Sequence, residues 1–134
     1  MKFQAKLNGR IFNLTDITTT PFTVTMQDCR YWTFVITHLA FGGELPPFRR
    51  IYIKKLKSWG YCHGRTAQRG KKNRYSELYM CNEYPNFSHF FTVLIHETAH
   101  HADWVHTGVM THGPKFFEWR KKLNKIFIPL HKAY

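Results

Sequence analysis

The segment between Pro85 and Gly108 constrains the fold more than any other part of the chain, because its apolar residues recur at helical spacing. A repeat of this period places them along one side of an α-helix. The stripe consists of Phe87, Phe90, Phe91, Leu94, Thr98 and Ala102. We expect a long amphipathic helix that begins after Asn86, ends near Thr107 with Gly108 as a left-handed cap, and buries this stripe in a core.

The same helix carries the motif His96-Glu97-Thr98-Ala99-His100. Residues four apart differ by about 40° around a helix and by about 6 Å along it, so both imidazoles can reach one metal ion. Glu97 is rotated by about 100° from His96, so its carboxylate can reach a water molecule in the open metal position instead. The motif predicts a metal site, with zinc as the expected ion, His96 and His100 as ligands, and Glu97 as the general base.

A catalytic zinc needs a third protein ligand. His106 has the spacing of a known pattern in which a glycine breaks the helix, but Asp103 stands where that glycine would be. His101 points about 100° away from His100, so we expect it at the surface or as a hydrogen-bond donor beside the site. Asp103 is expected to be a solvated carboxylate, with a hydrogen bond from a ligand imidazole as the alternative role.

His112 is the favoured third ligand, with Glu118 on the next helix as a further competitor. The helix runs about 10 Å beyond His100, and the residues from Gly108 to His112 can span up to about 14 Å. That length is enough for the chain to fold back over the metal. Gly113-Pro114 then begins another helix, which fixes the position of this ligand.

The remaining pattern indicates an α+β domain. Thr25 and Asp28 form a capping-box pattern before an amphipathic helix over about residues 26–41, whose apolar positions are Met26, Cys29, Trp32, Ile36 and Leu39. A small three-stranded sheet is expected from alternating segments at 48–57, 59–63 and 74–80. A closing helix from Pro114 places Phe116, Trp119, Leu123 and Phe127 toward the core, and Pro129 ends it.

The 134 residues are enough for one domain, which we place at residues 25–134. Residues 1–24 form an N-terminal arm, in which Asn8-Gly9 favours a hairpin turn and the Thr-rich part reads as a linker. No apolar run reaches the length of a membrane span, and the first residues do not form a signal peptide. Three cysteines at long spacings indicate free thiols in a reducing compartment. We expect a monomer in the cytoplasm, associated with the nucleoid or with DNA.

Charge points to a polyanionic partner. Lys and Arg number 20 against 8 acidic residues, a formal net charge of +12, which favours nucleic acid. A glycine-flanked basic loop is expected to contact phosphates, and two aromatic residues before it can stack on unpaired bases, so the partner is DNA, including single strands. The candidate contacts are Arg65, Arg69, Lys71, Lys72, Arg74, Trp59 and Tyr61.

Downstream of the motif, His112-Gly113-Pro114-Lys115-Phe116 completes a combination that resembles the SprT-like zinc metalloprotease family, which includes the SprT and Spartan protease domains. Trp59-Gly60-Tyr61-Cys62 and residues 74–78 resemble the strand region that precedes the active helix in that family. The resemblance covers about residues 26–126. It implies a single zincin-like domain, one zinc ion held by three histidines, and proteolysis of DNA-associated or DNA-crosslinked proteins.

The expected function is therefore a zinc-dependent endopeptidase that acts on DNA-associated proteins. One alternative is a nucleic-acid-binding module with a structural zinc, although such a site has no need for a carboxylate like Glu97 beside its ligands. The other is a zinc hydrolase with a dedicated substrate unrelated to DNA. Metal analysis and a cleavage assay separate these three functions.

Overall fold

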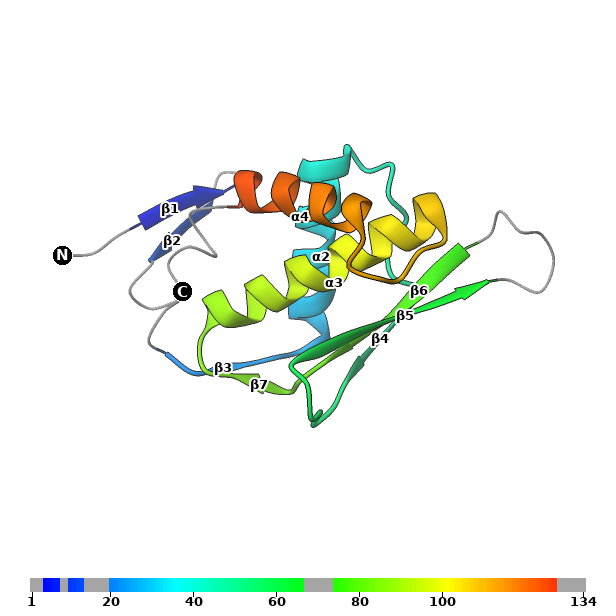
Figure 1. Ribbon diagram of the computed structural model, residues 1–134. Helices are drawn as coiled ribbons and strands as arrows, with labels where there is room; N and C mark the ends of the chain where they lie inside the picture. The colour runs from blue at the N-terminus through cyan, green and yellow to red at the C-terminus, as the bar shows by residue number, and fades with distance from the viewer. Residues whose placement is uncertain (1–3, 8–9, 14–19, 67–73, 128–134) are drawn as a thin grey trace.

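The computed structural model describes residues 4–7, 10–13, 20–66 and 74–127 (Figure 1). Its helices are α2 (Met26–Phe41), α3 (Phe87–Thr107) and α4 (Pro114–Ile126). Its strands are β1 (Gln4–Leu7), β2 (Arg10–Asn13), β3 (Phe22–Thr23), β4 (Arg50–Ile53), β5 (Gly60–Thr66), β6 (Arg74–Met80) and β7 (Glu83–Tyr84). The described residues thus form a mixed α+β fold, as predicted.

The central sheet has the strand order β4-β6-β5. β4 pairs with β6 in parallel and β5 pairs with β6 antiparallel, with Gly60 opposite Met80. β5 is therefore an outer strand, and its second edge has no strand partner among the described residues. Two short antiparallel pairs, β1 with β2 and β3 with β7, complete the strands.

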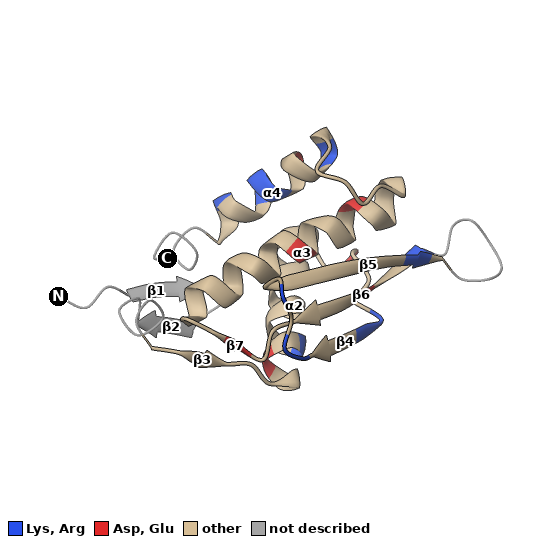
Figure 2. Ribbon diagram, turned by 60° about the horizontal axis from the view of Figure 1, so that its bottom comes forward, with Lys and Arg blue, Asp and Glu red and all other residues tan. Residues whose placement is uncertain are grey.

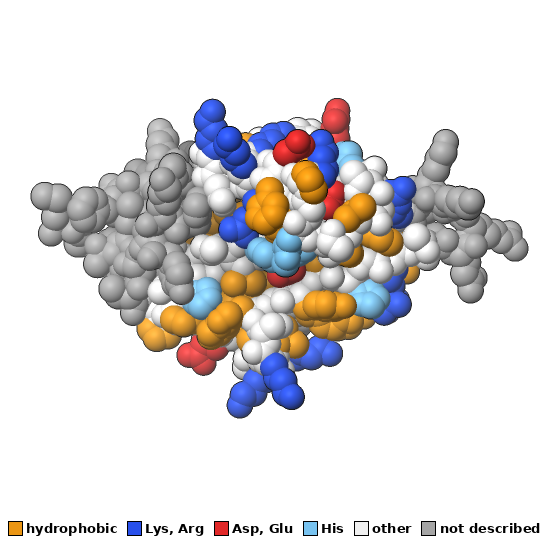
Figure 3. All heavy atoms as spheres, viewed as in Figure 1, with side chains coloured by type: hydrophobic (Ala, Val, Ile, Leu, Met, Phe, Trp, Pro, Cys, Tyr) orange, Lys and Arg blue, Asp and Glu red, His pale blue; other side chains and the backbone are white. Residues whose placement is uncertain are grey.

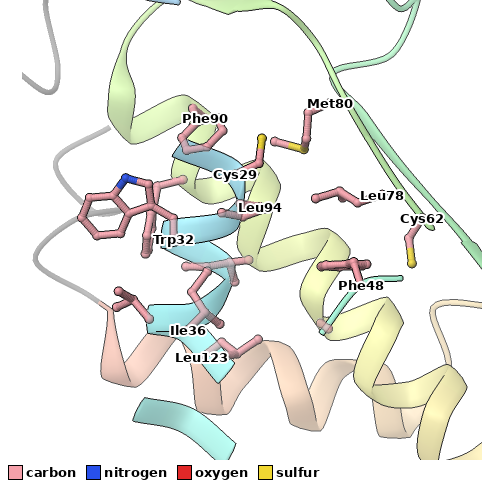
Figure 4. Close-up of a cluster of buried hydrophobic side chains, with 14 of the residues drawn as sticks. Cys29, Trp32, Ile36, Phe48, Cys62, Leu78, Met80, Phe90, Leu94 and Leu123 are labelled. Carbon is pink, nitrogen blue, oxygen red and sulfur yellow. The ribbon is translucent and has the colours of Figure 1, made fainter. Parts of the chain in front are cut away.

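Helix α3 lies between the central sheet and α4, while α2 crosses behind it (Figure 1). The predicted stripe of α3 is entirely buried, because it is enclosed by the sheet on one side and by α2 and α4 on the other. Figure 4 shows residues from every one of these elements meeting in one cluster, for example Leu94 of α3, Leu78 of β6 and Leu123 of α4. Burial of each such side chain stabilises the fold by about 1.5–3 kcal/mol.

The predicted helix boundaries are confirmed at the residues that cap them. The Thr25 side chain accepts from the Asp28 backbone N–H, and the Asp28 carboxylate accepts from the Thr25 backbone N–H, which is a capping box. Asn86 caps α3 by accepting from the His89 backbone N–H. Gly108 ends that helix with φ 74°, a left-handed conformation that favours glycine.

Other predictions need correction or lie outside the described residues. Met26 and Leu39 of α2 are exposed rather than core-facing, because α2 packs through Thr33, Val35 and Ala40 as well as through its predicted apolar residues. The expected hairpin is present as β1 and β2, whereas its turn residues and Pro129 lie outside the described residues. Among the helices that the structure describes, none has the length and apolar character needed to cross a bilayer.

Candidate metal centre

Three imidazoles converge where α3 faces the turn before α4. The Nε2 atom of His112 lies 3.2 Å from that of His100 and 3.4 Å from that of His96. Two nitrogens bound at about 2.0–2.1 Å to a tetrahedral metal ion lie roughly 3.3–3.4 Å apart. These two separations therefore match edges of a tetrahedral metal site, and the ligand atoms of all three histidines lie within 4.8 Å of one another, close enough to bind one metal ion.

Each ligand position follows from local structure. His96 and His100 share one side of α3 because they are four residues apart. Gly108 turns the chain at the end of α3, and Pro114 begins α4, so His112 sits in a short connection that folds back over the helix. Phe116 is buried under all three rings, at centroid distances of 5.1 Å from His96, 4.3 Å from His100 and 4.8 Å from His112.

The environment keeps these ligands neutral. Burial lowers the pKa of both His96 and His100 to about 4, and the neighbouring imidazoles and Arg120 act in the same direction. Neutral imidazole is the form that binds a metal ion. His96 and His100 are therefore neutral, and able to bind a metal ion, at neutral pH.

Figure 3 shows histidine side chains gathered at the surface in the middle of that view, with acidic atoms beside them.

Glu97 is buried next to the ligands without being one of them. Its carboxylate lies against Gly60 of β5, where a Cβ atom would be 3.4 Å from Glu97 Cγ and 2.6 Å from Val93 Cγ1. Only glycine lets the strand approach α3 this closely. Burial raises the pKa of Glu97 to about 7, and the charge of Arg120 partly opposes this rise. Such a carboxyl group can both take up and release a proton near neutral pH.

Arg120 of α4 is the cation that sequence reasoning did not assign to this site. It is half-buried and lines two hollows, one of about 560 Å³ shared with His96, His112 and Phe117, and one of about 310 Å³ shared with His96 and Glu97. Burial lowers its pKa, but a guanidinium remains charged. The sequence does contain a signal for this position: Arg120 is four residues after Phe116, so both residues lie on the same side of α4.

Asp103 is completely buried rather than solvated, which corrects the sequence-based expectation. Its Oδ1 accepts a hydrogen bond from Thr107 Oγ1 at 2.8 Å, whereas its Oδ2 is buried without a hydrogen-bond partner. The Nδ1 atom of His100, one turn earlier, is also buried without a partner. Asp103 favours the charged form of His100 electrostatically, as expected for a carboxyl group near an imidazole. No hydrogen bond joins the Asp103 carboxyl group to His100 Nδ1, so the alternative role, in which Asp103 orients a ligand through such a bond, stays a prediction.

His101 is also buried, not exposed, and it faces away from the converged imidazoles. Its Nε2–H donates to the carbonyl oxygen of Pro46 at 2.6 Å, and its Nδ1 accepts from the hydroxyl of Ser76. Its ring also packs against Phe48 at 4.5 Å. His101 therefore links α3 to β6 and to the segment before β4, and both ring nitrogens are used within the protein.

The other candidate ligands lie elsewhere. His106 is exposed, and its Nδ1–H donates to the carbonyl oxygen of Ala102 at 2.7 Å. Glu118 is exposed and forms an ion pair with Lys115 at 3.1 Å. Neither residue belongs to the group of converging side chains.

The predicted nucleic-acid contacts that the structure describes do not all lie on one surface. Arg65 pairs with Glu77, while Arg74 lies against Gly108 and donates to Trp104 O at 3.4 Å at the end of α3. Tyr61 is exposed on the face of the sheet opposite α3, whereas Trp59 packs against His89 near the start of α3. Trp59 also lines the smaller hollow beside Glu97. The remaining candidates, Arg69, Lys71 and Lys72, lie outside the described residues.

These geometric findings stand on the chain alone. No protein-family model and no curated protein matches the chain, and no solved structure matches it.

Proposed function

We propose that this protein is a zinc-dependent endopeptidase with a zincin-like architecture, similar to the SprT-like proteases, that acts on DNA-associated proteins. One observation carries the proposal: three histidine side chains converge closely enough to hold one metal ion, with His112 Nε2 at tetrahedral spacing from the other two, and a buried carboxyl group, Glu97, lies beside them and outside the ligand set. A purely structural site needs ligands only. A hydrolytic site also needs a proton acceptor next to an open coordination position.

The donor set fits zinc. Imidazole nitrogens suit Zn²⁺, and three protein ligands leave the fourth tetrahedral position for water or substrate. His96, His100 and His112 would hold the ion, and the Asp103 carboxyl group would raise the basicity of His100 electrostatically. When bound, zinc would act as a Lewis acid that lowers the pKa of a bound water molecule and polarises the carbonyl group of the substrate.

Glu97 handles the protons of the reaction. Its carboxylate accepts a proton from the attacking water and delivers it to the nitrogen of the departing amine. Its pKa of about 7 suits both steps, because burial removes much of the solvation that makes ordinary carboxyl groups strong acids. The close approach of Gly60 leaves this side chain little freedom to move away from the site.

Arg120 stabilises the negative charge that develops on the oxygen of the attacked carbonyl group. Its guanidinium lines the hollows on both the ligand side and the Glu97 side of His96. Among the described residues, no ion pair or hydrogen bond joins it to another side chain. A preorganised cation in a partly desolvated cleft stabilises a transition-state oxyanion more strongly than it would in water.

The outer edge of β5 provides a place for a peptide. An extended chain can add to such an edge through backbone hydrogen bonds, which recognise any sequence. Gly60 at the start of β5 lies against Glu97, so a peptide bound along this edge would pass the general base. This arrangement supports an endopeptidase acting on polypeptides rather than a hydrolase for small molecules. The basic composition, +12 overall, favours substrates that are bound to DNA.

The decisive experiment compares the wild-type protein with Glu97→Gln. Metal content is measured in both by mass spectrometry, and cleavage of a DNA-binding protein is followed with and without single-stranded DNA. We expect about one zinc per chain in both proteins, and a loss of cleavage by about 100- to 10,000-fold in the variant. The amide keeps the size of the side chain, so the fold is retained.

Zinc in both proteins without cleavage by the wild type would replace the proposal with a zinc-binding module. Equal cleavage by a zinc-loaded Glu97→Gln protein would exclude Glu97 as the base. His106→Ala serves as the matched control for a histidine of the same helix, and it should leave both zinc content and cleavage unchanged.

A further inference from the structure

The face of the central sheet that points away from α3 carries an ordered set of aromatic and basic side chains, which we call the outer sheet face. Side chains alternate along a strand, and Leu78 and Met80 of β6 point into the core. Tyr75, Glu77 and Tyr79, which occupy the alternate positions of β6, therefore point outward. The outer sheet face comprises Arg50, Tyr52, Tyr61, His63, Arg65, Tyr75, Glu77 and Tyr79.

The strand register aligns three tyrosines in one row across the sheet. Tyr79 of the middle strand is opposite both Tyr52 and Tyr61. The rings of Tyr52 and Tyr79 stack at 4.8 Å with an interplanar angle of 19°, and Tyr61 lies 5.8 Å from Tyr79. Half of the surface of Tyr61 is exposed. The three rings form a continuous aromatic surface across all three strands, and Tyr61 is its exposed end.

Cations surround this row. Lys54 Nζ lies 5.5 Å from the Tyr52 ring and 5.1 Å from the Tyr79 ring, and Arg49 covers Tyr75 at 4.4 Å. Figure 2 shows Lys and Arg at both ends of β4 and at the far end of β5. The only carboxylate on this face, within the described strands, is that of Glu77, and Arg65 neutralises it. Residues 48–80 hold ten of the 20 Lys and Arg residues and one of the eight acidic residues.

We infer that the outer sheet face binds single-stranded nucleic acid, with bases stacked on the tyrosine row and the phosphate backbone following the surrounding cations. Stacking on aromatic side chains requires unpaired bases, because a duplex keeps its base faces covered. The tyrosine row lies across the face of the sheet, not on a helix of the kind that enters a groove of a duplex. A polyanion also complements a face whose single carboxylate is already paired. In the proposed protease, the outer sheet face would be the surface that binds the nucleic-acid partner. It lies on the opposite face of the sheet from the metal centre, and nucleic-acid binding there does not require the metal.

The test measures binding of the full chain to fluorescein-labelled oligothymidylate, oligouridylate and a duplex of equal length by fluorescence anisotropy, across a salt series. We expect the wild type to bind the single strands more tightly than the duplex. Tyr61→Leu should weaken this binding by about fivefold or more, because one stacking contact is lost, while Tyr61→Phe should bind like the wild type. Lys54→Gln should weaken binding and reduce the salt slope by about 0.7, the share of one phosphate contact.

Phe34→Leu and Lys122→Gln are matched controls, since they remove an exposed aromatic residue from α2 and a cation from α4. Neither should change the affinity, and circular dichroism checks that every variant folds. The oligothymidylate and oligouridylate arms decide whether the strand is DNA or RNA. Absence of binding by the wild type at low salt, equal affinity for the duplex, or unchanged binding by Tyr61→Leu and Lys54→Gln would each overturn the inference. Glu97→Gln should retain full binding, so a failure of the proposed protease function remains distinguishable from a failure of this site.

Discussion

Two sides of helix α3 use histidine in opposite ways. On the side toward α4, the Nε2 atoms of His96 and His100 face another imidazole, and His100 Nδ1 is buried without a partner. On the side toward the sheet, the adjacent residue His101 uses both ring nitrogens in hydrogen bonds to Ser76 and Pro46. His100 and His101 are both buried, so burial alone does not distinguish a candidate ligand from a structural histidine. What separates a candidate ligand from a structural residue is whether its polar atoms are already satisfied within the protein.

The largest expected effect is on the ligand side of this comparison. His112→Ala should lower the affinity for zinc by at least about 100-fold, measured by competition with a chelating dye, because one of three ligands is lost. His112 is exposed, so the apoprotein should unfold at the same denaturant concentration as the wild type. Zinc affinity equal to that of the wild type would show that the converged imidazoles are not the metal site.

The structural side should respond in the reverse way. His101→Leu leaves the Pro46 carbonyl oxygen and the Ser76 hydroxyl without their partner in the core. We expect the free energy of unfolding of the apoprotein to fall by about 2 kcal/mol, measured by urea denaturation. Zinc affinity of the folded variant should stay within about twofold of the wild type. A large loss of zinc with unchanged stability would place His101 in the metal site after all.

Asp103 tests whether the unsatisfied atoms on the ligand side have a function. Asp103→Asn should lower zinc affinity by roughly tenfold, because the Asp103 carboxyl group raises the basicity of His100 electrostatically. The amide oxygen can still accept from Thr107, and a neutral NH2 group takes the place of the buried carboxyl oxygen that has no partner. The apoprotein should therefore be at least as stable as the wild type. Reduced stability with unchanged zinc affinity would make Asp103 a purely structural residue.

Much of the fold was predictable because local signals decide it. The apolar stripe, Asn86 and Gly108 define α3 without reference to the rest of the molecule, and the same holds for Thr25 and Asp28 at the start of α2. The strands of the sheet were located, but their order and the short pairing of β3 with β7 depend on long-range contacts that no local pattern specifies. Trp59 and Tyr61 illustrate this limit. Two residues apart, they would share a face of a regular strand, but β5 begins only at Gly60, and Trp59 before it packs against His89 while Tyr61 packs against Tyr79.

The candidate site divides in a similar way. Helical spacing brings His96 and His100 together, and chain length allows His112 to reach them. Whether Asp103 and His101 are exposed depends instead on what packs against α3. The sheet and Pro46 cover His101, and Asp103 is enclosed near the end of the helix. Arg120 joins the site only because α4 lies along α3, an arrangement that the sequence of α4 alone does not specify.

The smallest expected effect concerns pH and sharpens the same contrast. Burial lowers the pKa of His101 to about 4 from its ordinary value of 6.5, with the hydrogen bond to Pro46 opposing this decrease and the charge of His106 adding to it. The unfolded chain takes up a proton below about pH 6.5, whereas folded His101 does so only near pH 4, so this residue's contribution to stability is complete above pH 6.5 and is lost as the pH falls toward 4. Between about pH 7.5 and about pH 5.5, the loss of unfolding free energy from this one group is about 1 kcal/mol.

His96 and His100 titrate in the apoprotein as well, so the measurement compares the pH dependence of the unfolding free energy in the wild type with that in His101→Leu, which retains both. The variant should show the shallower dependence, by about that amount. Parallel curves for the two proteins would mean that His101 is protonated as easily in the folded chain as in the unfolded one, and that its hydrogen bonds to Ser76 and Pro46 do not hold it neutral.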